Sequence, residues 1–296
     1  MTTLRLRDRT LDVRAGSPLI MGIVNAGADS FSDAVRLDTL ERQVEHGLEL
    51  VAEGADLVDV GAESGVTYTP TAAPEDEAAR VVPLVERLAA EGVSVSVDTW
   101  KPEVARAALE AGAVMLNDVS GLRDPALAEL AGRTGAALVL MHTRAEPKRE
   151  AFPAYDDVAA DVEAFLRERI DLALDHGVAR EQLVLDPGPD FAKTPAQTVA
   201  VLRELDRLLA LGRPLLLAIS RKYFLGAITG RPPAERLAAT LAAATWAAEA
   251  GAAILRVHDV AAVRDALAVK AVLDGREELP AFDANDDELK WIRADR

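Results

Sequence analysis

Short apolar runs alternate along the chain with longer segments of helical period. Eight runs rich in valine, isoleucine and leucine are predicted strands, at residues 19–25, 57–61, 93–98, 114–118, 137–142, 183–187, 214–220 and 254–258. The segments that follow repeat apolar residues every three to four positions and are predicted helical at 38–53, 75–91, 102–111, 125–133, 156–177, 195–211, 233–250 and 260–273. Near-continuous apolar strands separated by helices indicate a parallel sheet covered by helices on its outside.

Eight strand–helix units in a chain of 296 residues predict an α/β fold, a (β/α)8 TIM barrel. A doubly wound open sheet is the alternative, and the absence of G-x-G-x-x-G after the first predicted strand disfavours it. No linker rich in proline, glycine or serine divides the sequence, so residues 1–296 are predicted to form a single domain. Residues 1–17 are expected to make a small hairpin at the barrel base, and residues 280–296 a surface tail.

The amino-acid composition excludes or disfavours several classes of binding partner and site. No stretch approaches the roughly 18 consecutive apolar residues of a membrane span, and the N-terminus lacks the apolar core of a signal peptide. Cysteine is absent, which excludes disulfides and thiolate metal sites. The net charge of −16 disfavours nucleic acid and anionic membranes, whose phosphates would be repelled. These features predict a cytoplasmic protein whose partners are small molecules.

Polar residues stand at the carboxyl end of every predicted strand. They are Asn25, Asp59, Asp98, Asn117, Asp118, His142, Asp186, Ser220, Arg221, Lys222, Arg256 and His258. One such residue is usually a helix cap or a turn former. Because all eight ends of a closed barrel converge on the face where such folds carry their active sites, the set together predicts a site there.

The residue types at these ends suit a planar heterocycle that carries an anionic leaving group. Carboxylates and amides bind the N–H and amino groups along the edge of such a ring. Lys222, Arg256 and His258 supply positive charge or donors for a phosphate. Asn25 offers an oxygen ligand for Mg2+ that is held mostly by water and a diphosphate. The sequence contains no Ser/His/Asp triad, P-loop or zinc signature.

Nine short segments, in order and in register, carry a resemblance to a known family. They are IMGIVN (20–25), DSFSD (29–33), GADLVDVGAES (54–64), VSVDTWKPEVARAALEAGAVMLNDVSG (95–121), LMH (140–142), LDPG (185–188), F-x-K (191–193), SRK (220–222) and RVHDV (256–260). Across residues 19–273 the chain resembles the dihydropteroate synthases, which join a pterin to p-aminobenzoate.

The resemblance implies a role for particular positions. The pterin contacts are Asp98, Asn117, Asp186 and Lys222, with Met141 lining the pocket and Arg256 stacking on the ring. The resemblance places Asn25 at the Mg2+ and diphosphate, Arg256 and His258 at the diphosphate anion, and Phe191, Ser220, Arg221 and Lys222 around p-aminobenzoate. The implied catalytic residues are Lys222, Asp98, Arg256 and Asp33. Asp33 stands in the first loop, together with Asp29, Phe31 and Ser32.

The chain departs from the family pattern in its loops. The first loop usually reads Asn-x-Thr-Pro-Asp-Ser-Phe and here reads NAGADSF at 25–31. The second usually reads Glu-Ser-Thr-Arg-Pro-Gly and here reads ESGVTY at 63–68, so its arginine is missing. Arg36 and Lys148 are candidates to replace that charge, while Asp59 and Glu63 are interpreted as structural. The pterin positions are thus retained and the p-aminobenzoate loops are altered.

The function implied is a Mg2+-dependent transferase that makes 7,8-dihydropteroate. The alternatives are a divergent synthase for another arylamine, a pterin-binding protein without catalysis, and a methyltetrahydrofolate methyltransferase, which the SRK and RVHDV segments disfavour. Family members are commonly homodimers, and the alanine-rich run 237–251 is the candidate interface. The arylamine preference and the response to sulfonamides do not follow from the sequence.

Overall fold

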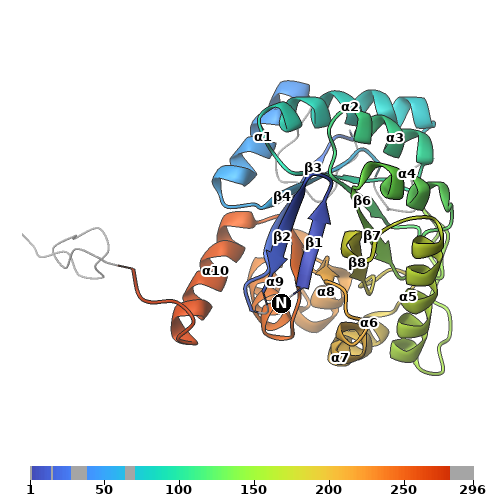
Figure 1. Ribbon diagram of the computed structural model, residues 1–296. Helices are drawn as coiled ribbons and strands as arrows, with labels where there is room; N and C mark the ends of the chain where they lie inside the picture. The colour runs from blue at the N-terminus through green and yellow to red at the C-terminus, as the bar shows by residue number, and fades with distance from the viewer. Residues whose placement is uncertain (1, 15, 28–38, 64–70, 281–296) are drawn as a thin grey trace, which may run out of the picture.

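Eight parallel strands form the barrel that the apolar runs predict. The computed structural model describes residues 2–14, 16–27, 39–63 and 71–280. The strands follow the order β8-β7-β6-β5-β4-β3-β10-β9, and a parallel bridge between Leu185 and Leu215 brings the two edges together, which confirms the (β/α)8 TIM barrel (Figure 1). They are β3 (Leu19–Asn25), β4 (Leu57–Gly61), β5 (Val95–Asp98), β6 (Met115–Asp118), β7 (Ala137–Met141), β8 (Leu183–Asp186), β9 (Leu216–Leu217) and β10 (Ile254–Val257).

The seventh barrel strand is shorter than the sequence predicts. Of residues 214–220, only Leu216–Leu217 pair with β10. The residues beyond them stay buried but leave the ladder, and Arg221 takes a left-handed conformation with φ +57°. Ser220, Arg221 and Lys222 therefore lie in a turn at the barrel mouth instead of in the strand.

Ten α-helices cover the outside of the barrel in the described part of the chain. They are α1 (Leu40–Ala52), α2 (Pro74–Ala90), α3 (Pro102–Glu110), α4 (Ala126–Thr134), α5 (Val158–Asp175), α6 (Pro195–Arg203), α7 (Leu205–Leu209), α8 (Tyr223–Thr229), α9 (Leu237–Glu249) and α10 (Val260–Leu273). The predicted helix 195–211 is wrong as one element, because Glu204 leaves helical geometry at φ −116° and divides it. The seven-residue α8 was not predicted, since it is too short to show a helical period.

Local sequence signals begin several of these helices. Pro102 and Pro195 stand in the first turn of α3 and α6, where a missing N–H costs no hydrogen bond. Thr194 and Gln197 form a capping box at the start of α6, and the Asp157 side chain accepts two backbone N–H groups at the start of α5. These signals fix where each helix leaves the barrel mouth.

The N-terminal hairpin closes the base of the barrel. Strands β1 (Thr2–Leu6) and β2 (Arg9–Val13) pair antiparallel, and Figure 1 shows them lying across one end of the barrel. Leu4 and Leu6 are fully buried in one cluster with Met21 and other residues of the barrel interior. The hairpin predicted within residues 1–17 is thus present over residues 2–13, and it covers the end of the barrel opposite the carboxyl ends of the strands.

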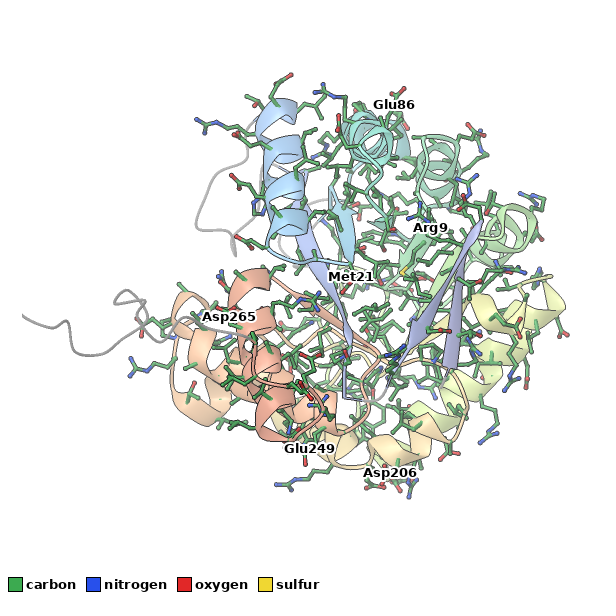
Figure 2. All side chains as sticks on the ribbon, turned by 60° about the vertical axis from the view of Figure 1, so that its left-hand side comes forward. Arg9, Met21, Glu86, Asp206, Glu249 and Asp265 are labelled. Carbon is green, nitrogen blue, oxygen red and sulfur yellow. The ribbon has the colours of Figure 1, made fainter. Side chains whose placement is uncertain are left out.

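The acidic residues lie mainly on the outer faces of the helices. Figure 2 shows Glu86, Asp206, Glu249 and Asp265 at the periphery, whereas Met21 lies inside. The side chains of these four acidic residues are exposed to solvent. No helix in the described part of the chain is long and apolar enough to cross a membrane.

Candidate active site

The strand register brings the last residues of β3, β4 and β5 and a residue near the end of β6 side by side, and three of these four are polar. Asn25 pairs with Gly61, Gly61 with Asp98, and Asp98 with Asn117. A Cβ atom built on Gly61 would lie 3.3 Å from the Cβ of Asp98, so the glycine leaves room for that carboxyl side chain. The convergence predicted from the strand ends is therefore realised on one rim of the barrel.

A buried carboxylate organises this rim. Asp59 is completely buried, and its Oδ2 accepts hydrogen bonds from Asn117 Nδ2 at 3.0 Å and from Arg256 Nε at 2.6 Å. A second guanidinium nitrogen of Arg256 donates to Asp98 Oδ2 at 3.2 Å. Because Asn117 donates to Asp59, the carboxylate sets the orientation of that amide. Asp59 Oδ1 has no hydrogen-bond partner among the described residues.

Two carboxyl groups of the site titrate near neutral pH. Burial raises the pKa of Asp98 to about 7, although the Arg256 guanidinium acts in the opposite direction. Burial also raises the pKa of Asp186 to about 6, against the hydrogen bond that Gly188 N–H donates to its Oδ1 at 2.7 Å. A ligand that donates N–H groups to these carboxyls would favour their ionised forms.

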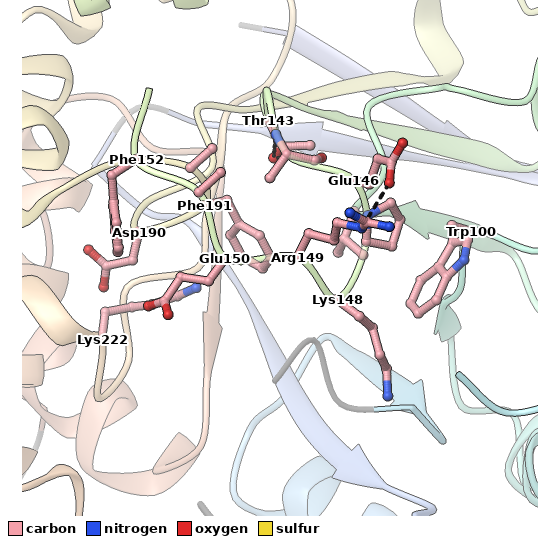
Figure 3. Close-up of a pocket in the computed structure, with 15 residues that line it drawn as sticks. Trp100, Thr143, Glu146, Lys148, Arg149, Glu150, Phe152, Asp190, Phe191 and Lys222 are labelled. Carbon is pink, nitrogen blue, oxygen red and sulfur yellow. Dashed lines mark hydrogen bonds and ion pairs between the residues drawn. The ribbon is translucent and has the colours of Figure 1, made fainter. Parts of the chain in front are cut away.

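Lys222 and Phe191 line a cavity beside this rim. The Nζ atom of Lys222 lies 4.4 Å from the centroid of the Phe191 ring, within the range of a cation–π interaction. Burial lowers the pKa of Lys222, while Asp190 and Asp186 oppose that change. The cavity has a volume of about 330 Å³, and Figure 3 shows Trp100 across it from Lys222 and Phe191. Lys148 and Arg149 also line this cavity, so its aromatic side chains and cations suit a small aromatic anion.

Ser220 and His258 meet at the mouth, but Arg221 is engaged elsewhere. His258 Nδ1 lies 2.9 Å from Ser220 Oγ. Arg221 forms a two-point ion pair with Asp259, with distances of 2.7 and 3.2 Å, and Arg236 holds its carbonyl oxygen at 2.8 Å. The guanidinium of Arg221 therefore helps to fix the turn before α8, whereas the pair of Ser220 and His258 presents donors at the mouth.

The remaining predicted residues lie on the same rim or outside the described part of the chain. Asn25 ends β3, and Met141 ends β7 with 1 % exposure. Asp33 and its loop neighbours fall outside the described residues. The described residues contain no cluster of three or more His, Cys, Asp or Glu that could hold a metal ion. Asn25 alone suits an ion held mostly by water and a diphosphate.

A second buried network joins the stems of the second loop. Lys101 Nζ lies 2.5 Å from Glu63 Oε2 and 2.6 Å from Glu77 Oε2, and Lys148 Nζ lies 2.9 Å from Glu63 Oε1. Glu63 also accepts the N–H of Ala72, as expected for a carboxylate that binds loop amides. The ammonium of Lys148 thus contacts the carboxylate that precedes the altered loop.

Sequence reasoning missed the organising role of Asp59 and the Lys101 network. Asp59 stands inside the apolar run LVDVG, and a carboxylate in a strand buried on both faces requires buried partners. That signal identifies Asp59 but not its partners. Nothing in the local sequence joins Lys101 to Glu77, which lies 24 positions earlier.

Comparison with known proteins agrees with this site. The family model described as "Pterin binding enzyme" matches residues 21–258. The dihydropteroate synthase of Mycobacterium leprae is 47 % identical over 260 residues, which cover 84 % of this chain and 91 % of that protein. Two structures of the Xanthomonas albilineans dihydropteroate synthase, one with 7,8-dihydropteroate and one with 4-aminobenzoic acid, are 44 % identical with TM-scores of 0.81 and 0.84. Each covers 94 % of this chain and 100 % of its own.

Proposed function

Because this chain belongs to the dihydropteroate synthase family, we propose that it is a transferase that condenses 6-hydroxymethyl-7,8-dihydropterin diphosphate with p-aminobenzoate. The products are 7,8-dihydropteroate and diphosphate. The observation that carries the proposal is the convergence of Asp98, Asn117, Asp186, Lys222 and Arg256 at the barrel mouth. Carboxylates, an amide and two cations there suit the edge and face of a pterin.

The reaction is a substitution at the methylene carbon of the pterin. The bond from carbon to the diphosphate oxygen breaks, the arylamine nitrogen forms the new bond, and that nitrogen then loses a proton. Asp98 and Asp186 hold the pterin, and Arg256 supplies positive charge beside it. The protein contributes orientation and fixed electrostatics, with no covalent intermediate on the chain.

Asn25 is the residue that would hold Mg2+. The described donor set fits an ion with a single protein ligand and the rest of its shell from diphosphate and water. When bound, the ion would neutralise charge on the departing diphosphate. His258 and Ser220 lie 2.9 Å apart at the mouth and would donate to the same anion.

The pH dependence of pterin binding follows from the two perturbed carboxyls. Their pKa values are raised to about 7 and about 6, so each must lose a proton before it accepts the pterin N–H groups. We expect affinity for the pterin diphosphate to fall as the pH decreases from 8 to 5, and binding near pH 6.5 to release protons. Calorimetry in two buffers of different ionisation enthalpy measures that release; proton uptake on binding would contradict the assignment.

The deciding experiment is a coupled assay on the purified protein with the pterin diphosphate, p-aminobenzoate and Mg2+. Diphosphate release and pteroate formation are followed together. We expect turnover that EDTA abolishes and excess Mg2+ restores, and a loss of about 100-fold or more in Lys222→Ala. Pterin binding without turnover would favour the non-catalytic pterin-binding protein, and turnover only with another arylamine would favour the divergent synthase. No pterin binding would refute the proposal.

We further propose a cytoplasmic homodimer. The dimer is supported by apolar side chains that α9 and α10 expose, among them Leu237, Trp246, Val269 and Leu273. The inner face of α9, through Ala244 and its neighbours, packs on the barrel instead. Sedimentation equilibrium measures the mass, and a Trp246→Glu variant is expected to dissociate the dimer.

A further inference from the structure

Lys193 is a lysine buried on the turn that follows β8, and no carboxylate among the described residues forms an ion pair with it. It is fully buried, and its Nζ lies 2.7 Å from Nδ1 of His142. The ammonium also donates to the carbonyl oxygens of His142, Gly188 and Phe191, at 3.3, 3.1 and 3.0 Å. All four acceptors are neutral, so the ammonium cross-links backbone segments instead of forming an ion pair.

His142 continues this connection to α5. Burial and the neighbouring Lys193 lower the pKa of His142 to about 3, so its ring is neutral at physiological pH. Since protonated Lys193 has only N–H groups to offer, Nδ1 accepts and Nε2–H donates to Asp161 Oδ2 at 2.9 Å. Arg144 holds the other oxygen of Asp161 at 2.7 Å. The neutral imidazole is therefore fixed as an acceptor for Lys193.

The turn that Lys193 holds is conformationally strained. Gly188, Asp190 and Ala192 all have positive φ, at +64°, +65° and +50°. Gly188 also approaches β7 so closely that a Cβ atom would lie 2.2 Å from the carbonyl oxygen of His142. Left-handed backbone at residues other than glycine persists only where the surroundings impose it. The two turn carbonyls that accept from Lys193 are those of Gly188 and Phe191, which enclose the strained Asp190.

The same turn carries groups that face the reaction site. Gly188 N–H donates to Asp186 at 2.7 Å, and the Phe191 ring lies 4.4 Å from Lys222 Nζ. Phe191 and Lys222 line the 330 Å³ cavity, as Figure 3 shows, whereas Lys193 does not.

We propose that Lys193 is a positioning residue for the second substrate: its buried ammonium holds turn 188–192 in the conformation that presents Phe191 beside Lys222. The placement of the arylamine at Phe191 and Lys222 rests on the proposed function. Lys193 itself contacts no substrate and acts through the turn.

The pH profile is a readout that a purely structural role would not move. Burial lowers the pKa of Lys193 to about 7; the charges of Asp186, Asp161 and Asp190 oppose this change, and that of Lys222 adds to it. A neutral amine has only two N–H groups for four acceptors. The KM for p-aminobenzoate is therefore expected to rise as the pH increases through the pKa of Lys193.

The test replaces Lys193 with methionine, which keeps the length and removes the donors. The kcat/KM for p-aminobenzoate is expected to fall about 100-fold because KM rises, which is the effect of a misplaced contact. A smaller change is expected in the Kd of the pterin diphosphate, since Gly188 of the same turn donates to Asp186. The matched control is Arg213→Met, because Arg213 is a buried cation that donates to the carbonyl oxygens of Leu183 and Thr3 at the barrel base. That variant is expected to lose stability and to keep both KM values.

Two further variants guard against a general folding defect. Because the chain has no cysteine, Lys193→Cys carries a single thiol, and its alkylation with 2-bromoethylamine restores an ammonium at that position. We expect the alkylated protein to regain the KM and, since a thioether lowers amine basicity, to shift the pH profile to lower pH. Tyr155→Phe removes the bond from Tyr155 Oη to the Ala192 carbonyl oxygen, 2.9 Å, and is expected to raise the same KM by less.

The outcomes separate this inference from the proposed function. Absence of turnover in the unaltered protein would refute the function itself. Turnover with an unchanged arylamine KM in Lys193→Met, or equal changes in Lys193→Met and Arg213→Met, would overturn the positioning role alone. If the Lys193 variants do not fold, an unchanged KM for p-aminobenzoate in Tyr155→Phe overturns the positioning role.

Discussion

Replacing Arg256 with methionine is expected to lower kcat/KM for the pterin diphosphate by about 100- to 1,000-fold, the usual effect of deleting one charge-stabilising donor. The guanidinium bridges two carboxylates of the rim, Asp59 and Asp98, at 2.6 and 3.2 Å. Its loss removes positive charge from the site where the diphosphate departs. It also leaves the buried carboxylate of Asp59 without its main counter-charge.

The same variant is expected to change the pH dependence of binding. Arg256 is the main influence that lowers the pKa of Asp98 against burial, so the pKa of Asp98 rises further without it. Since the pterin requires the ionised carboxylate, the pH below which binding fails should move upward. Calorimetry between pH 6 and pH 9 measures this displacement. A lysine at this position is expected to restore only part of the activity, because one ammonium cannot donate to both carboxylates in the geometry of a guanidinium.

Arg264→Met is the matched control for Arg256. Arg264 also forms an ion pair with an aspartate, Asp56, at 2.8 Å, but at the opposite end of the barrel. We expect this control to keep the kinetic constants and the pH profile of the unaltered protein. An Arg256→Met variant that behaved like the control would contradict the role assigned to the guanidinium.

The barrel was predictable because burial and strand pairing coincide in most of its strands. The predicted bounds of β3 and β4 agree with the structure because a polar or glycine residue ends each apolar run where the ladder ends. In β9 the two properties separate. Residues up to Ile219 stay buried while only Leu216–Leu217 pair with β10, and apolar patterning reports burial alone.

The sequence predicted which residues belong to the site but not which contacts they make. Residues such as Asp98 and Asn117 stand at strand ends, and a closed barrel brings those ends together for any conformation of the loops. The contact between Lys193 and His142 joins positions 51 residues apart and depends on the path of one strained turn. No local pattern encodes such a pairing, so the sequence shows Lys193 only as part of the F-x-K segment and does not indicate its partners.

The largest stability effect is expected at Lys101, where methionine should lower the free energy of unfolding by about 3–5 kcal/mol. The Lys101 ammonium lies between Glu63 and Glu77 at 2.5 and 2.6 Å and also donates to the carbonyl oxygen of Ala72. Glu77 is completely buried and its Oε1 has no partner among the described residues. Without Lys101, two carboxylates remain buried together with less positive charge. The loss is a large part of the roughly 5–15 kcal/mol that stabilises a typical domain.

The direction of the pH effect provides a second test of the Lys101 network. In the unaltered protein, contacts with Lys101 and Lys148 outweigh burial and hold the pKa of Glu63 below its usual value, so this stabilisation is lost as the pH falls through that pKa. In Lys101→Met only Lys148 and the N–H of Ala72 still oppose burial at Glu63, so the pKa of Glu63 should rise and the variant should lose less stability than the unaltered protein as the pH falls from 7 to 5. Urea unfolding at both pH values measures the two slopes, and parallel slopes would contradict the argument.

Two further variants test whether the loss of stability in Lys101→Met comes from a buried, uncompensated carboxylate. Adding Glu77→Gln to Lys101→Met removes the uncompensated carboxylate and should recover part of the lost stability. Arg231→Met breaks an ion pair of similar length, 2.9 Å to Glu235, but both of its side chains are exposed. Exposed pairs contribute only about 0–1 kcal/mol, so this control should unfold almost as the unaltered protein does. Equal losses in Lys101→Met and Arg231→Met would mean that the buried network adds no stability beyond an ordinary surface pair, and that the second loop is held by other contacts.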